Sequence, residues 1–160
     1  MGTRNSLDYS GRVVLVTGGT KGIGAGIARR FLEAGAQVVV CGRQQPERLP
    51  EGGGRQAIFI AADVRKLDSL EQLFARLRED LGRLDVVVNN AGGSPAVEAA
   101  SVSPRFSEGI VQLNLLAPLN VAQQANRLMQ AQAGGAPRRG VHAELRGVAA
   151  DHDFVDGVLP

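Results

Sequence analysis

Length, composition and charge exclude several classes of protein. The chain has 160 residues, 44% of them hydrophobic, so it is long enough to bury a sizeable core and predicts a single main domain. Its formal net charge is +2, its arginines are scattered and only 4% of its residues are aromatic, which argues against nucleic-acid binding. The single cysteine, Cys41, excludes an internal disulfide, and no apolar run approaches the roughly 18 residues of a membrane span. We expect a soluble, cytoplasmic protein.

The first part of the chain alternates between strand-like and helix-like segments. Branched apolar residues predict strands over 12–17 and 36–41, with a helix over 22–34 between them and Gly35 at its end. Prolines and three consecutive glycines then predict a loop over 44–55. Apolar residues at helical spacing predict the buried stripe of the first helix: Ile23, Ile27, Phe31 and Ala34.

The middle of the chain continues this alternation. A third strand over 56–61 precedes a helix over 68–81, in which Asp68 and Glu71 have the spacing of a capping box. A fourth strand follows over 84–89. Strands that alternate with helices predict an α/β fold, with a parallel sheet covered on both faces in the doubly wound, Rossmann-type manner.

The last part of the chain divides into a long helix and a tail. A helix is predicted over 104–133, bent near Pro118 because proline interrupts the hydrogen-bond ladder. We therefore expect a folded domain over 1–133 and a divergent tail over 134–160, either out of frame or disordered, which would leave the sheet truncated at its C-terminal side. Within the tail, 141–148 is a candidate for a substitute edge strand.

A glycine-rich turn joins the first predicted strand to the first predicted helix. Residues 17–24 read TGGTKGIG. Gly18 and Gly22 allow a tight turn that brings the backbone close to phosphates, and Gly24 lets the helix pack against the strand. The N-H groups at the start of such a helix bind anions, so the motif predicts a site for a dinucleotide pyrophosphate. A plain strand-to-helix turn is the alternative.

Four motifs in this order resemble the classical short-chain dehydrogenases/reductases over about residues 10–133. They are the glycine-rich turn, Asp63 with Val64 after the third strand, NNAG at 89–92, and Asn114 in the next helix. The resemblance implies that the domain binds a nicotinamide dinucleotide. It also implies an oxidoreductase that moves a hydride between that cofactor and a carbonyl or alcohol. The substrate itself is not predicted.

The resemblance implies a role for each motif. Asp63 contacts the adenine, the NNAG segment lines the adenine side of the pocket and braces the sheet, and Asn114 supports the proton relay. From the residues alone, Asp63 and the asparagines of NNAG are also compatible with turn chemistry, and Asn114 with a helix residue bonded to a backbone carbonyl. The implied cofactor-binding residues are Gly18, Thr20, Lys21, Gly22, Ile23, Gly24, Arg43, Asp63, Val64, Asn90, Ala91 and Gly92.

The residues after the second strand indicate which cofactor is preferred. An acidic side chain there binds the ribose hydroxyls of NAD, whereas the 2'-phosphate of NADP needs cations. Gly42 and Arg43 occupy this place, no acid occurs before Glu47, and Lys21 adds a positive charge. We therefore predict NADP(H) over NAD(H). An exposed, solubilising arginine is the alternative for Arg43.

The residues that the family uses for proton transfer are not found downstream of Asn114. The resemblance calls for a serine and a Tyr-x-x-x-Lys motif, but no Ser, Thr, Tyr or Lys follows Ser107, and the only tyrosine, Tyr9, precedes the first strand. We expect cofactor binding with little or no turnover. A non-catalytic nucleotide-binding module and a non-functional fragment are the alternatives. The His and Asp residues of the tail have no metal-ligand spacing, so no metal is expected.

The long helix carries a candidate surface for self-association. If the sheet lacks further strands, the helix loses apolar surface that would otherwise pack against them. We therefore expect an exposed apolar patch and a possible homo-oligomer through the helix at 104–133. The residues expected in this patch are Leu113, Leu116, Leu119 and Val121.

Overall fold

A five-stranded parallel sheet forms the centre of the structure. The computed structural model describes residues 7–132 and 141–144, and only the backbone of the second range. The order of the strands across the sheet is β5-β2-β1-β6-β7, so the first strand lies in the middle and the winding reverses between β1 and β6. This order confirms the predicted Rossmann-type, doubly wound α/β fold. The strands are β1 (Val13–Thr17), β2 (Gln37–Gly42), β5 (Ile58–Ala61), β6 (Val86–Asn89) and β7 (Val141–Glu144).

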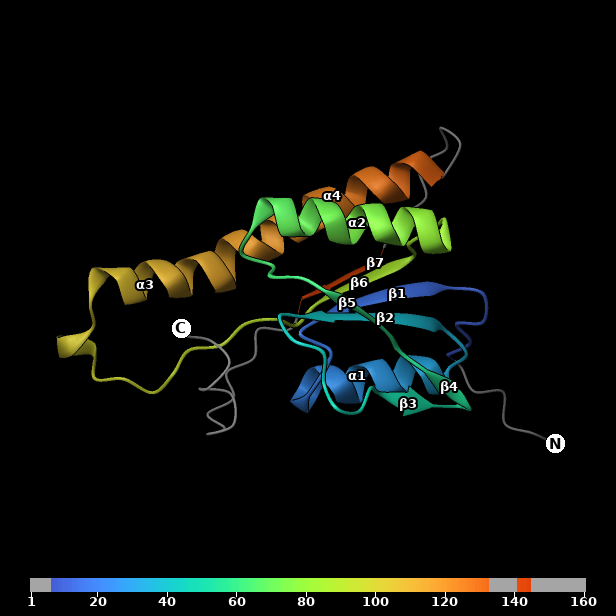
Figure 1. Ribbon diagram of the computed structural model, residues 1–160, viewed down its shortest axis with the longest axis horizontal. Coiled ribbons are helices and arrows are strands. Elements are labelled where there is room, and N and C mark those ends of the chain that lie inside the picture. The colour runs from blue at the N-terminus through green and yellow to red at the C-terminus, as the bar shows by residue number, and fades with distance from the viewer. Residues whose placement is uncertain (1–6, 133–140, 145–160) are drawn as a thin grey trace.

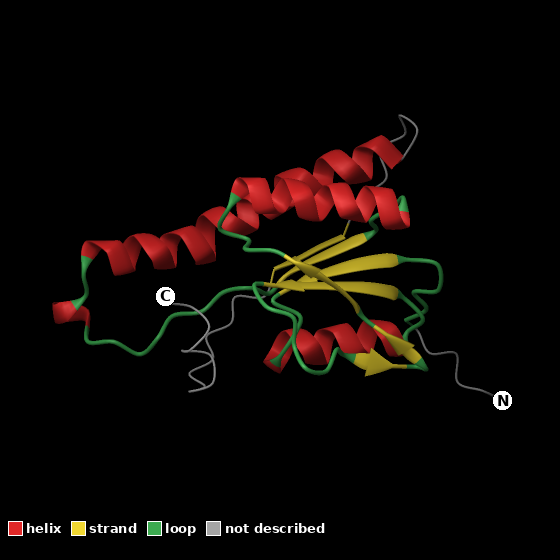
Figure 2. Cartoon of the chain, in the orientation of Figure 1, coloured by secondary structure: helices red, strands yellow, loops and turns green. Residues whose placement is uncertain are grey.

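Helices cover both faces of this sheet. Figure 1 shows α1 on one face and α2 and α4 side by side on the other, while α3 projects beyond the end of the sheet. Figure 2 shows the long loop that leads from β6 towards α3. In the described residues, no helix is long and apolar enough to cross a membrane. The helices are α1 (Gly22–Glu33), α2 (Leu67–Leu81), α3 (Pro104–Val111) and α4 (Ala117–Gln132).

Alternate residues of β1 face the two helical layers. Val14 and Val16 lie in one apolar cluster with Leu32 of α1, and Leu15 lies in the other with Leu73 of α2. In the four pairs from Val14–Val38 to Thr17–Cys41, the residues of both β1 and β2 are buried, because side chains alternate between two covered faces. Burial on both faces explains why these strands read as continuous apolar runs in the sequence.

The predicted apolar stripe of α1 is only partly correct, because Ile27 and Phe31 pack against the core while the fully buried face lies about one position further along. Ala25, Ala28 and Leu32 are buried, whereas Ile23 is 56% exposed and Phe31 is only half-buried. Small side chains let the helix approach the sheet closely, which a stripe of Ile and Phe would prevent. Packing distance, rather than hydrophobicity alone, therefore decides which face of α1 is buried.

The start of α2 also differs from the prediction. Its first turn has no side-chain cap, so Asp68 and Glu71 do not form a capping box. Instead, the Oγ of Ser69 accepts a hydrogen bond of 2.9 Å from the N–H of Asp63 and ties the helix to the loop after β5. At the other end, Gly82 adopts a left-handed φ of 67° and terminates the helix.

The prediction of a loop over 44–55 is wrong at its end, where a small antiparallel hairpin forms. Gly53 and Gly54 have φ values of 57° and 74°, which suit the two-residue turn of a tight hairpin. Gly52 lies so close to α1 that a Cβ atom there would be 2.7 Å from the carbonyl oxygen of Arg29. The flanking strands have two residues each, too few to show alternation in the sequence. They are β3 (Glu51–Gly52) and β4 (Arg55–Gln56).

The predicted single helix over 104–133 is divided by a π-helical segment, Gln112–Leu116. The N–H that follows this segment donates to the carbonyl of Gln112, five residues earlier. Pro118 has no N–H to donate to the carbonyl of Asn114, so the α-helical ladder cannot run through this point. The irregularity therefore lies just before Pro118, and residue 133 is outside the described range.

The expected apolar patch on the long helix is only partly correct. Leu113 and Val121 are buried in the core beside α2, because the π-helical segment and α4 lie directly over the sheet. Leu116 and Leu119 are exposed, as expected, and two further apolar residues are exposed beside them, so the exposed set has four members. They are Val111, Leu115, Leu116 and Leu119.

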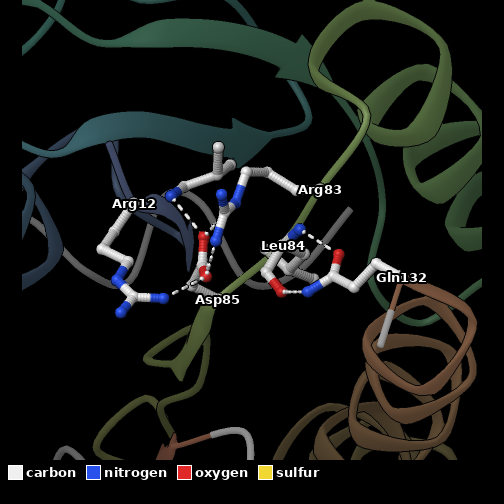
Figure 3. Close-up of polar contacts among 6 residues, drawn as sticks. Arg12, Arg83, Leu84, Asp85 and Gln132 are labelled. Atoms are coloured by element: carbon white, nitrogen blue, oxygen red, sulfur yellow. Dashed lines mark hydrogen bonds and ion pairs between the residues drawn. The ribbon is translucent and has the colours of Figure 1, made fainter. Parts of the chain in front are cut away.

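Polar side chains fasten β1 to β6 at their amino ends (Figure 3). The carboxylate of Asp85 accepts hydrogen bonds from Arg12 at 3.0 Å, from the N–H of Val13 at 2.9 Å, and from Arg83. Burial raises the pKa of Asp85, but its hydrogen bonds from Arg83, Val13 and Arg12 outweigh that effect and hold the pKa below its usual value. This cluster lies at the amino ends of the strands, whereas the glycine-rich turn lies at the carboxyl end of β1.

A second polar contact fastens α4 to the chain just before β6. The side-chain amide of Gln132 accepts a hydrogen bond from the N–H of Leu84 and donates one to the carbonyl of the same residue (Figure 3). Because Leu84 is fully buried, these two bonds satisfy backbone groups that water cannot reach.

The tail supplies an edge strand, as expected. β7 pairs in parallel with β6, and Val141 lies opposite Val86. The prediction for 141–148 is thus confirmed over Val141–Glu144. Residues 145–148 and the remainder of 134–160 lie outside the described residues.

Candidate functional site

The glycine-rich turn lies between the carboxyl end of β1 and the start of α1. Gly18 and Gly22 have φ values of 62° and 55°, a region that side-chain-bearing residues rarely adopt. A Cβ atom on Gly24 would lie 2.3 Å from the carbonyl oxygen of Gly18. Each of these three positions therefore requires glycine, two for the turn and one for the close approach of α1.

Thr17 and Asn90 brace this turn against the loop after β6. The Nδ2 of Asn90 donates to the carbonyl oxygens of Thr17 at 3.0 Å and of Gly18 at 3.1 Å. In return, the Oγ1 of Thr17 accepts hydrogen bonds from the N–H groups of Asn90 and Ala91. The two loops at the point where the winding of the sheet reverses thus form one rigid unit, and ligands of such sheets bind at this point.

A pocket opens between these loops. It encloses about 700 Å³ of empty space, including the part open to solvent. Most of the residues that sequence analysis assigned to cofactor binding line it. These residues are Gly18, Thr20, Lys21, Arg43, Asp63, Val64, Asn90, Ala91 and Gly92.

Other predicted residues lie outside the lining of this pocket. Gly22 and Gly24 shape the turn, the side chain of Ile23 is 56% exposed, and Asn114 lies behind the loop after β6. Five lining residues were not among the predicted binding residues. They are Cys41, Gly42, Ala62, Arg65 and Leu113.

The side chain of Asn114 is bonded to backbone groups. Its Oδ1 accepts from the N–H of Gly93 at 2.8 Å, and its Nδ2 donates to the carbonyls of Gly93 at 2.8 Å and Ile110 at 3.0 Å. A Cβ atom on Gly92 would lie 2.9 Å from Asn114 Oδ1, so glycine is needed beside it. The amide thus holds the loop after β6 in place. Its role in a proton relay stays a prediction.

Asp63 is paired with an arginine that no motif predicted. Arg65 donates to it through Nε at 3.0 Å, through Nη2 at 2.8 Å and through the backbone N–H at 3.1 Å. The hydrogen bond from the Arg65 guanidinium lowers the pKa of Asp63 against the opposing effect of burial. The Asp-x-Arg spacing is the signal in the sequence that could have indicated this pair. It does not show whether the arginine side chain folds back onto the aspartate or extends into solvent.

The pocket fits one end of a dinucleotide. The glycine turn brings backbone close to the pocket at the start of α1, where phosphate groups bind. Lys21 and Arg43 add positive charge, and Val64, Ala91 and Leu113 add apolar surface suited to a planar base. In the described residues, no group of three or more His, Cys, Asp or Glu side chains gathers to hold a metal ion. Fold and site together define a Rossmann-type nucleotide-binding protein.

Comparison with known proteins places the chain in a family. Residues 12–136 match the family described as short chain dehydrogenase. The chain is 41% identical over 120 residues to an L-fucose dehydrogenase of Oryctolagus cuniculus, covering 73% of this chain and 42% of that protein. It is 38% identical over 130 residues to a rhamnolipids biosynthesis 3-oxoacyl-[acyl-carrier-protein] reductase of Pseudomonas aeruginosa, covering 78% and 50%. The chain belongs to the short-chain dehydrogenase/reductase family.

Solved structures agree with this assignment. An NADP active-site complex of RhlG from Pseudomonas aeruginosa has a TM-score of 0.72 and 29% identity, covering 86% of this chain and 55% of that one. A ligand-free aldohexose dehydrogenase of Thermoplasma acidophilum has a TM-score of 0.73 and 26% identity, covering 86% and 50%. The chain thus spans about half the length of these relatives. Proteins of this family bind a nicotinamide dinucleotide.

Proposed function

We propose that this chain is the cofactor-binding part of an oxidoreductase that prefers NADP(H) to NAD(H). In the family, the cofactor exchanges a hydride with a carbonyl or alcohol. The observation that carries the preference is the presence of Lys21 and Arg43 in the pocket lining. Gly42 occupies the end of β2, where an acidic residue would bind the ribose hydroxyls of NAD.

The surroundings of Arg43 support this assignment. Gly42 places no side chain, and therefore no acidic group, directly before Arg43 at the end of β2. The charge of Arg43 also reaches the pocket carboxylate, since it contributes to the lowered pKa of Asp63. A guanidinium in this place offers paired donors to the 2'-phosphate of NADP, which NAD lacks.

Competitive binding of the two cofactors tests the preference. Fluorescence titration of the purified chain is expected to give a dissociation constant for NADPH at least about tenfold below that for NADH. A difference of about tenfold in affinity is what one charge-assisted hydrogen bond to the 2'-phosphate contributes. Arg43→Gln should remove most of this difference. Arg48→Gln is the matched control, because Arg48 is also exposed and follows β2 but does not line the pocket. Tighter binding of NADH by the unaltered chain would overturn the proposal.

We further propose that these 160 residues by themselves bind the cofactor without appreciable turnover. The family's proton donor is a tyrosine with a lysine four residues later, and the printed sequence has neither after Ser107. Purified chain is therefore expected to bind NADPH but not to oxidise it above background with a panel of aldehydes, ketones and 3-oxo esters. Turnover that scales with protein concentration and survives repurification would refute this.

We also propose that the chain self-associates through its exposed helical face. Support comes from four exposed apolar side chains on α3, the π-helical segment and α4. Light scattering with size exclusion should then report a dimer, and Leu115→Lys with Leu119→Lys should yield a monomer. A monomeric unaltered chain at micromolar concentration would contradict this. The four side chains are Val111, Leu115, Leu116 and Leu119.

Two expectations from the sequence stay proposals. A cytoplasmic location has the support of Cys41, a buried free thiol. A divergent tail over 134–160 has the support of the family match, which ends at residue 136, whereas β7 of that tail extends the sheet of the domain beyond the proposed limit at residue 133.

A further inference from the structure

Arg65 adds a third positive charge to the lining of the cofactor pocket. It lies in the loop after β5 and lines the pocket together with its partner Asp63. The guanidinium contacts both carboxylate oxygens, with Nε 3.0 Å from Oδ1 and Nη2 2.8 Å from Oδ2. Such a two-bond fork fixes orientation as well as charge. We refer to these two residues as the Asp63–Arg65 pair.

The pair is held from two sides. The Nε2 of Gln112, in the π-helical segment, donates to the backbone carbonyl of Arg65 at 3.0 Å. On the other side, the N–H of Asp63 donates to the Oγ of Ser69 at 2.9 Å. The side chains of Arg65 and Asp63 are only 26% and 17% exposed. Their ion pair is therefore better shielded from solvent than an ordinary surface pair.

The charge balance of the pocket depends on this pair. Among the described residues that line the pocket, the cations are Lys21, Arg43 and Arg65, and the one carboxylate is Asp63. An unpaired carboxylate beside Arg43 would compete for that guanidinium and repel a phosphate group bound there. The fork from Arg65 occupies three of the roughly four lone-pair positions of Asp63, counting its backbone N–H. Arg43 is then left available to a phosphorylated ribose.

We infer that Arg65 determines specificity for the phosphorylated cofactor by neutralising Asp63. This inference rests on the proposed binding of NADP(H) and adds a residue to it. Arg65 acts as a positioning residue: it need not touch the cofactor, because its effect passes through the carboxylate. The consequence concerns discrimination between NADPH and NADH rather than affinity for dinucleotides in general, since the two cofactors differ only at the 2'-phosphate.

The test is the ratio of the dissociation constants of NADH and NADPH in a set of variants. Arg65→Gln should lower this ratio about tenfold, because it exposes one uncompensated charge close to the phosphate. Arg65→Lys keeps the charge but loses the two-bond fork, so it should lower the ratio less than Arg65→Gln does. Arg76→Gln is the control, because Arg76 belongs to an exposed ion pair on α2 and does not line the pocket.

Asp63→Asn shows whether Arg65 acts through the carboxylate. If Arg65→Gln acts by leaving Asp63 uncompensated, then adding Asp63→Asn removes that charge and should return the ratio to within about twofold of the unaltered chain. If Asp63→Asn does not restore the ratio lost in Arg65→Gln, Arg65 acts independently of Asp63 and the inference is overturned. Thermal unfolding of each variant identifies losses of binding that come from misfolding. The dissociation constant of NADH serves as an internal reference, because misfolding would weaken the binding of both cofactors.

Failure of the inference and failure of the proposed function give different results. If the unaltered chain prefers NADPH but Arg65→Gln keeps that preference, only the role of Arg65 is wrong. If the unaltered chain binds NADH more tightly or binds neither cofactor, the proposed function fails and the inference fails with it.

Discussion

The Nδ2 of Asn90 donates to the carbonyl oxygen of Gly18 over 3.1 Å, and this bond joins the two loops that flank the pocket. The two residues are far apart in the sequence and belong to different strands' loops. Because the same Nδ2 also donates to the carbonyl of Thr17, one amide fixes the shape of the glycine-rich turn.

Replacing this amide by a carboxylate should damage both the fold and the site. Asn90→Asp removes the donor and sets a negative charge against two carbonyl oxygens, so we expect a loss of about 3 kcal/mol in the free energy of unfolding. Affinity for NADPH should fall at least about tenfold in parallel, since the pyrophosphate turn loses its brace. Urea unfolding and fluorescence titration measure the two effects. Asn126→Asp on the exposed side of α4 is the control, and an equal loss there would contradict the assignment.

Two glycines of α1 should respond in opposite directions to alanine. Gly24→Ala places a Cβ atom 2.3 Å from the carbonyl oxygen of Gly18, so α1 must move away from the turn. We expect a loss of about 2 to 4 kcal/mol in stability and loss of measurable cofactor binding. Gly26→Ala meets no atom within 4 Å and should stabilise the helix by about 0.5 to 1 kcal/mol. Thermal unfolding of both variants checks the pair, and similar effects at the two sites would show that close packing of Gly24 is unimportant.

The Asp85 cluster should make stability depend on pH (Figure 3). The pKa of Asp85 is lowered in the folded chain, so its contribution is present above the unfolded pKa near 4 and is lost as the pH falls through the folded value. Asp85→Asn is expected to lose about 1 to 2 kcal/mol at pH 7, a figure reduced because Arg12 and Arg83 are about half exposed. The difference from the unaltered chain should shrink towards pH 3.

A matched control exists for this pH dependence. Arg76 and Asp80 form an exposed pair on one helix, with 61% and 50% of their side chains accessible. Asp80→Asn should therefore change the free energy of unfolding by less than about 0.5 kcal/mol. Urea unfolding at pH 7, 5 and 3.5 compares the two variants. A pH-independent loss in Asp85→Asn would mean that shape, and not charge, matters at this position.

Cys41 should be chemically inert in the folded chain although it lies at the pocket. Burial raises the pKa of its thiol to about 12, so almost no thiolate exists at pH 8. The native chain is expected to resist a disulfide reagent such as DTNB, and to release one equivalent of the chromophore after unfolding in urea. Rapid reaction of the native chain would show that β2 opens locally at this strand end.

The sequence by itself determined the alternation of strands and helices, and hence the parallel sheet and its Rossmann-type order. It also determined the pyrophosphate turn, because a positive φ and a close backbone approach leave a readable mark at Gly18, Gly22 and Gly24. These features depend on residue type and on neighbours near in the chain. Resemblance to a known family then placed Asp63, Asn90 and Asn114 at the correct loops and helix.

Tertiary structure alone decided what the polar side chains of the site contact. Asn114 bonds to the backbone of Gly93, and Gln112 bonds to the loop that carries Arg65, because the fold places the π-helical segment beside these two loops. Arg65 folds onto Asp63 because burial favours pairing the carboxylate over leaving it alone. Such choices depend on distances between segments that the sequence keeps far apart, which local patterns do not encode.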